Sequence, residues 1–255
     1  MTKAARFSPP EKDFLERRSP EDIETIRPKT FERSIKKYVN LWEDGRVTSP
    51  RNQIPCNACT SFGLAASLEA RHLSETGESV ELATGWMHRC IMNASCKRGL
   101  SLSAVVRKMS GRFIPYADQG FYPWEKDNCD IEGEIEFRDV RKFDFDLLMH
   151  DALTQGVVVA VGMNIDTEFE WWMGGGPYSL TPGKRRYQHV AALIGYDDNE
   201  RIWFLKNSLG DGWGDGGFFT VRYGECGIGT EYGGFGAVPW DFVRGRGSAS
   251  GLDIA

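Results

Sequence analysis

The amino-acid sequence predicts an α+β fold with two lobes and a cleft between them. Residues from about 51 to 140 are rich in helix formers, and the run 62–73 places apolar residues on or near one side of a helix. Residues from about 141 to 231 instead contain strand-like runs, separated by turns rich in glycine and proline: VVVAVGM, HVAALIGY, RIWFLKNS and GFFTVRY. Because the two patterns lie in different halves of the chain, we expect two lobes, and clefts between lobes commonly hold functional sites.

The order of the elements also follows from the sequence. A short extended segment from about residue 37 is expected to join the second lobe; a loop then leads into a central helix that begins at or beside Cys59 and stops near Gly77. Further helices are predicted over 80–92, 100–109 and 143–156, and a strand over 131–143. We expect the folded domain to cover 39–240.

The two ends of the chain differ from this domain. Residues 1–38 are charged and contain four prolines, which predicts a tail, a short pro-segment or a packed extension. Residues 241–255 are expected to form a C-terminal tail. The start of the chain has no apolar stretch typical of a secretory signal peptide, whereas six cysteines favour an extracytoplasmic or secreted protein; the compartment therefore stays open.

Composition excludes several classes of partner. A formal net charge of −5 gives no basic surface for nucleic acid, and the longest apolar runs are too short to span a bilayer. We expect a soluble monomer that binds neither nucleic acid nor membranes.

Cys59 is a candidate nucleophile because it lies at the predicted start of a helix. The unpaired N–H groups and the positive end of the helix dipole at that position favour a thiolate. Cys56 and Cys59 also form a C-x-x-C, which could be half of a zinc site with Cys90, Cys96 or His88, but no second paired motif completes it. A thioredoxin-type redox pair is disfavoured further, since a loop and not a strand precedes the helix.

A nucleophilic cysteine needs a base and a group that orients the base. Three of the four histidines, His72, His88 and His150, fall within predicted helices and are expected to be packing or surface residues. His189 instead opens a strand after a glycine-rich loop, and Asn207 ends a later strand, where its amide could fix the imidazole.

Several separated motifs, in order, resemble the papain-like cysteine peptidase family. QIPCNACTSF is similar to the box around the family's nucleophile, QHVAALIGY to its histidine strand, and WFLKNSLGDGWGDGGFF to its asparagine-containing run. His189 and Asn207 follow Cys59 by 130 and 148 residues, within the family's spacing of about 130–150. The resemblance covers residues from about 38 to 240 and implies a two-lobed fold with a helical lobe, a β-barrel-like lobe and an active-site cleft.

The resemblance implies a role for each reacting residue. Cys59 would attack a peptide carbonyl, His189 would act as general base and then acid, and Asn207 would orient the imidazole. The Gln53 side chain and the Cys59 N–H would hold the oxyanion. A resting thiolate–imidazolium pair is implied, in which the pKa of such a thiol is about 3–4. No metal or organic cofactor is required.

The remaining cysteines and the substrate contacts are also implied only by the resemblance. Cys56 would pair with Cys96 and Cys90 with Cys129, which leaves Cys226 as a free thiol. The substrate would contact Gly99 and Gln188, and Glu231 would lie at the bottom of a pocket with Leu100 as an apolar wall, which predicts tolerance of basic and apolar side chains. Thr60 and Leu209 stand where the family has tryptophan, and Lys97 and Arg98 add charge beside Gly99.

These observations predict an endopeptidase that acts on peptides or proteins and could be blocked by a proteinaceous inhibitor. An enzyme that passes the same acyl-thioester to an amine, as a ligase or peptide-maturation enzyme, is the alternative within the enzyme class. A weak or inactive binding module on the same scaffold is the alternative outside it, because Thr60 and Leu209 depart from the family pattern.

Overall fold

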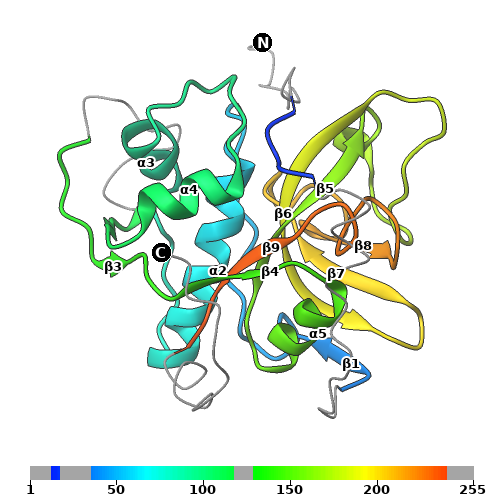
Figure 1. Ribbon diagram of the computed structural model, residues 1–255. Coiled ribbons are helices and arrows are strands. Elements are labelled where there is room, and N and C mark those ends of the chain that lie inside the picture. Colours follow the sequence, from blue (N-terminus) through cyan, green and yellow to red (C-terminus); the bar gives the residue numbers. More distant parts are fainter. Residues whose placement is uncertain (1–12, 18–35, 118–128, 240–255) are drawn as a thin grey trace.

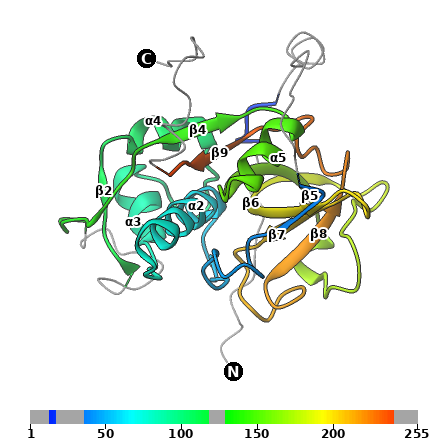
Figure 2. The ribbon, with the colours of Figure 1, turned by 90° about the horizontal axis from the view of Figure 1, so that it is seen from below.

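The computed structural model confirms the predicted α+β fold and its two lobes. It describes residues 13–17, 36–117 and 129–239. Most of the expected N-terminal extension and the expected tail over 241–255 therefore lie outside the described residues. In Figure 1 the helical lobe lies on the left and the β lobe on the right, and Figure 2 shows α2 running along the boundary between them.

The central helix of the helical lobe is α2, Cys59–Thr76. It begins at Cys59 and ends as predicted at Gly77, whose φ of 78° lies in the left-handed region and whose N–H donates to the Leu73 carbonyl. Its first thirteen residues, Cys59 to Arg71, are all buried. The helix is therefore an internal axis of the molecule and fixes the position of Cys59.

The rest of the helical lobe departs from the sequence prediction in two places. The predicted helix over 80–92 is a short α3, Thr84–Trp86, that continues as a π-helix, Met87–Ile91. The predicted strand over 131–143 is two strands, β3 at Ile135–Glu136 and β4 at Val140–Phe143. Asp139 separates them with a φ of 53°, a left-handed conformation that interrupts an extended chain and that aspartate tolerates better than most residues.

The remaining elements of this lobe are small. Helix α4 covers Leu102–Met109, close to the predicted 100–109, and β2, Phe113–Ile114, pairs with β3. Among the helices that the structure describes, none is long and apolar enough to cross a membrane.

The β lobe is an antiparallel sheet in the order β4-β9-β5-β6-β7-β8, with β1 also paired to β6. The strands and the helix of this lobe are β1 Tyr38–Asn40, α5 Asp146–Thr154, β5 Val159–Asp166, β6 Arg186–Asp197, β7 Ile202–Lys206, β8 Phe218–Arg222 and β9 Gly234–Ala237. All eight residues of β5 are buried, because strands flank it on both sides and α2 packs nearby. Strand β9, the last strand that the structure describes, pairs with both β4 and β5.

Helix α2 is fixed tightly against this sheet. A Cβ on Gly63 would lie 2.8 Å from Val190 Cγ1, so only glycine permits this approach to β6. Ser67 Oγ donates to the Val158 carbonyl (2.6 Å) and accepts from the Ala237 N–H (2.7 Å), which joins the helix to the start of β5 and to the end of the neighbouring β9. The element that carries Cys59 is thus held in register with the strand that carries His189.

A buried polar network also joins the two lobes. Glu69 of α2 accepts hydrogen bonds from Arg51 Nη2 (2.5 Å), the Leu82 N–H (2.9 Å) and Thr48 Oγ1 (2.7 Å). Lys206 Nζ, at the end of β7, donates to Thr48 Oγ1 (2.8 Å). Burial lowers the pKa of Lys206 to about 8, partly offset by the charge of Glu69. The network thus reaches Lys206, which directly precedes Asn207 in the sequence.

Candidate active site

Cys59 occupies the first position of α2 and is 3% exposed. Its thiol is free, and the backbone N–H groups of Val190 and Thr60 hydrogen-bond to it. Because Val190 follows His189 in β6, the thiol lies where the helical lobe meets the histidine strand. Burial raises the pKa of the thiol to about 11, although those N–H groups act to lower it.

His189 lies in β6 and is fully buried. Its Nε2 lies 2.9 Å from Asn207 Oδ1, and the same Oδ1 accepts the Ser208 N–H at 2.9 Å. Since both bonds need Oδ1 as the acceptor, Nε2 carries the proton and a neutral imidazole keeps its lone pair on Nδ1. Burial lowers the pKa of His189 to about 4, against the opposite effect of the Asn207 bond.

The thiolate–imidazolium pair that the resemblance implies stays a prediction, because burial shifts the pKa values of Cys59 and His189 in opposite directions. The raised pKa of Cys59 and the lowered pKa of His189 both favour neutral groups. The physical cause is the same for both residues, because burial penalises each charged form.

Aromatic side chains that sequence reasoning did not assign to the site cover the histidine. The Phe169 ring lies 5.4 Å from the His189 ring and 4.8 Å from the Trp213 ring, and Trp213 Nε1 donates to the Phe169 carbonyl (2.8 Å). Leu209, which replaces the family's tryptophan, is buried in the core of the β lobe. The G-D-G-W-G run was a signal for Trp213, whereas no local pattern marked Phe169.

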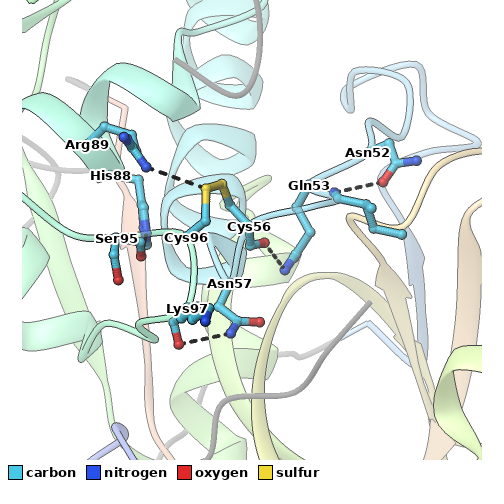
Figure 3. Close-up of a disulfide and its surroundings, with 10 residues drawn as sticks. Asn52, Gln53, Cys56, Asn57, His88, Arg89, Ser95, Cys96 and Lys97 are labelled. Atoms are coloured by element: carbon cyan, nitrogen blue, oxygen red, sulfur yellow. Dashed lines mark hydrogen bonds between the residues drawn. A yellow bond between two sulfur atoms is a disulfide. The ribbon is translucent and has the colours of Figure 1, made fainter. Parts of the chain in front are cut away.

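Gln53 is held beside the first disulfide. Its Nε2 donates to the Cys56 carbonyl (2.9 Å), and its Oε1 accepts from Ser208 Oγ (2.6 Å). Figure 3 shows this side chain next to the Cys56–Cys96 bond, which joins the loop before α2 to the loop that contains Lys97. The predicted oxyanion residue is thus fixed between the residue that follows Asn207 and the loop that leads into Cys59.

Both disulfides that the resemblance implies, Cys56–Cys96 and Cys90–Cys129, are formed, and Cys226 is a buried free thiol. Of the two cysteines of the C-x-x-C, Cys56 is bonded to Cys96 and Cys59 is a free thiol. Among the described residues no cluster of His, Cys, Asp and Glu could hold a metal ion.

The predicted substrate-binding residues contact a segment of the chain itself, residues 13–17. Gln188 Oε1 accepts the N–H groups of Phe14 and Leu15, the latter at 2.5 Å, and Gln188 Nε2 donates to the Leu15 carbonyl (3.1 Å). Gly99 lies against the Phe14 ring, where a Cβ would clash. In Figure 1 this segment enters at the top of the molecule, between α4 and the β lobe.

The Leu15 side chain is 9% exposed and packs into the cluster of buried residues that includes Cys59 and Leu100. A Cβ on Gly162 would lie 2.8 Å from Leu15 Cδ1 and 3.1 Å from Tyr232 Cβ. The small residue at 162 thus leaves the space that Leu15 fills, and Tyr232 forms another side of it. We call residues 13–17 the cleft segment.

Glu231, expected at the bottom of the pocket, binds Asn164, whose Nδ2 donates to Glu231 Oε2 (3.1 Å). The next residue, Tyr232, lines the cavity beside the cleft segment. Tyr232 OH donates to Asn164 Oδ1 (2.9 Å) and accepts from Arg17 Nε (3.0 Å). The negative charge of Glu231 helps to raise the pKa of Arg17, after the larger effect of the Tyr232 bond. Sequence reasoning missed Tyr232.

Known proteins resemble this chain in sequence and in fold. The chain is 24% identical over 213 residues to ananain from Ananas comosus, covering 78% of this chain and 61% of ananain. It is 28% identical over 203 residues to the viral cathepsin of Bombyx mori nuclear polyhedrosis virus, covering 73% and 60%. The chain thus spans about three fifths of each of these relatives.

Solved structures agree with the sequence matches. The Carica candamarcensis cysteine protease CMS1MS2 in complex with E-64 has a TM-score of 0.66 at 21% identity and covers 80% of this chain and 99% of its own. The ragweed pollen allergen Amb a 11, a cysteine protease in its proform, has a TM-score of 0.68 at 20% identity, with coverages of 86% and 73%. The sequence profile described as "Papain family cysteine protease" matches residues 36–233, so this chain belongs to the papain family of cysteine proteases.

Proposed function

We propose that the chain is a cysteine peptidase that cleaves peptide bonds through an acyl-thioester on Cys59. The observation that supports it most is the pairing of His189 with Asn207, which leaves Nδ1 as the basic nitrogen beside the strand position that hydrogen-bonds to the Cys59 thiol. Membership of the papain family supports the same chemistry.

The reaction follows from these positions. His189 Nδ1 takes the thiol proton as the sulfur of Cys59 attacks the peptide carbonyl, and the Cys59 N–H and the Gln53 amide hold the oxyanion. The protonated imidazole then gives its proton to the leaving amine, and the thioester forms. His189 next removes a proton from water as the water oxygen attacks the thioester carbon, and it gives this proton to the departing sulfur, which releases the acid product and regenerates the thiol. Asn207 holds the ring plane through both steps.

The cleft segment supports a peptide-binding role for the same surface. A peptide backbone, that of Phe14 and Leu15, is already held there by three hydrogen bonds with the Gln188 side chain, which accepts two and donates one, and an apolar side chain fills the adjacent pocket. We therefore assign Gln188, Gly99 and Leu100 to substrate binding and the cleft segment to a short pro-segment that must leave before a substrate enters.

Peptide cleavage tests this proposal. The full chain is incubated with a fluorogenic peptide library, alongside Cys59→Ala and His189→Ala variants, with and without an added amine. We expect hydrolysis by the wild-type chain and none by either variant. Amide products formed only with the added amine would instead support acyl transfer. Equal turnover by Cys59→Ala would refute the mechanism.

Intact-mass measurement tests the pro-segment separately. Loss of N-terminal residues in the wild-type chain, and retention of them in Cys59→Ala, is the expected result. Equal loss in both chains would mean that another protease removes the segment. No loss from an active wild-type chain would show that the cleft opens without cleavage of the segment.

A further inference from the structure

We propose that the cleft has a second subsite, which accepts an acidic side chain and is formed by Ser101 and Ser103 beside the apolar pocket. The inference rests on the proposed function, since it treats the cleft segment as an image of a bound peptide. It predicts that the enzyme favours peptides in which an apolar residue and Asp or Glu are neighbours.

The geometry at Glu16 carries this inference. Glu16 Oε1 accepts hydrogen bonds from Ser101 Oγ (3.2 Å) and Ser103 Oγ (2.5 Å), so two hydroxyl groups converge on one carboxylate oxygen. Ser101 Oγ also accepts the Ala104 N–H (3.3 Å) as the cap of α4 and lies 3.0 Å from Ser103 Oγ, so its own O–H faces both the other hydroxyl and the carboxylate. Hydrogen bonds to an ionised acceptor are stronger than those to a neutral one, so this arrangement favours a carboxylate over an amide.

The charges near the subsite do not oppose an acid. Its cavity has a volume of about 180 Å³ and is lined by the pair Lys142 and Asp144, whose charged atoms are 2.9 Å apart and cancel, and, within the cleft segment, by Arg17. Arg17 is bound to Tyr232 and to Asp13 (3.2 Å), and Asp13 lies outside the cavity lining. Apart from Glu16 and Arg17 of the cleft segment itself, the charged groups lining the cavity are thus one cation and one anion.

The apolar pocket and the serine pair are adjacent. Leu15 fills the space at Gly162, and the next residue of the cleft segment, Glu16, reaches Ser101 and Ser103. A bound peptide running in either direction would place neighbouring side chains in these two subsites. The pair of side chains, apolar then acidic or the reverse, is therefore the recognised unit.

The test uses the full chain with Leu15→Asp, a substitution outside the catalytic groups that weakens the cleft segment. Fluorogenic peptides share one sequence with Leu for the apolar pocket and carry Glu, Gln or Lys at the position on either side of it. We expect kcat/KM for Glu to exceed that for Lys by about tenfold and that for Gln by a smaller factor. Adding Ser103→Ala should reduce the Glu preference, and Ser103→Asp should reverse it towards Lys.

Ser110→Ala is the matched control, because Ser110 is exposed at the other end of α4 and should leave the preference unchanged. An active enzyme without a Glu preference, or a preference that survives Ser103→Asp, would overturn this inference while leaving the peptidase proposal intact. If no peptide is cleaved, the proposed function fails, and calorimetric binding of the same peptides still decides the subsite. Equal binding of the Glu and Lys peptides would then refute it.

Discussion

Replacing Leu15 with Asp should open the cleft. The Leu15 side chain is 9% exposed and fills the space beside Gly162 and Tyr232. Burying a leucine side chain contributes about 1.5–3 kcal/mol, and a charged replacement cannot recover that energy in an apolar pocket. A loss of about 2 kcal/mol lowers, by roughly 30-fold, the ratio of molecules with the cleft segment bound to molecules with the cleft open. The catalytic groups themselves are unchanged.

The assay measures kcat/KM for a fluorogenic peptide at low concentration, immediately after dilution of the full chain. Where the segment occupies most molecules, we expect Leu15→Asp to raise kcat/KM by about 30-fold. Asp13→Ala is the control, because Asp13 belongs to the same segment but its side chain is exposed. The reasoning is refuted if Leu15→Asp leaves kcat/KM unchanged while thermal unfolding shows an intact fold.

Four further substitutions test other parts of the account. Gln53→Ala should lower kcat by about 10²–10³-fold in steady-state assays if its amide holds the oxyanion. Burial lowers the pKa of His189 in the folded state, so the unfolded chain binds a proton at a higher pH than the folded chain does. The free energy of unfolding should therefore decrease by about 3 kcal/mol as the pH falls from about 6.5 towards 4. Urea unfolding measures this decrease, which should be absent in His189→Gln. Glu69→Gln should cost about 3–5 kcal/mol of unfolding free energy, because it leaves the charge of Arg51 without its buried partner. Glu231→Ala should lower turnover of peptides with Arg in the apolar pocket and spare those with Leu; an unchanged Arg/Leu ratio would remove Glu231 from specificity.

Local patterns in the sequence were sufficient for the framework of the site. The switch from loop residues to helix formers placed Cys59 at the start of α2, and the strand run before Asn207 placed that amide at the end of β7. Both predictions depend on residues that are close together in the chain, where propensity and periodicity act directly. The two-lobed fold followed from the same patterns.

Other features could not be predicted because they depend on contacts between distant residues. The bond between Leu15 and Gln188 joins positions 173 apart, and no local pattern encodes it. The raised pKa of Cys59 and the lowered pKa of His189 arise from burial, which sequence motifs do not report. The break at Asp139 was hidden because residues on both sides of it have strand-like composition.

The central claim, that His189 activates Cys59, is tested most directly by site-mapped alkylation. The full chain is treated with substoichiometric iodoacetamide at about pH 6, and the two free thiols are compared by peptide mapping. Burial raises the pKa of Cys226 to about 12, so it serves as an internal reference for an unactivated thiol. Because His189 takes the thiol proton as the sulfur of Cys59 attacks the reagent, we expect preferential labelling of Cys59 that is lost in His189→Ala. Equal labelling of both thiols, or preferential labelling of Cys59 that persists in His189→Ala, would contradict it.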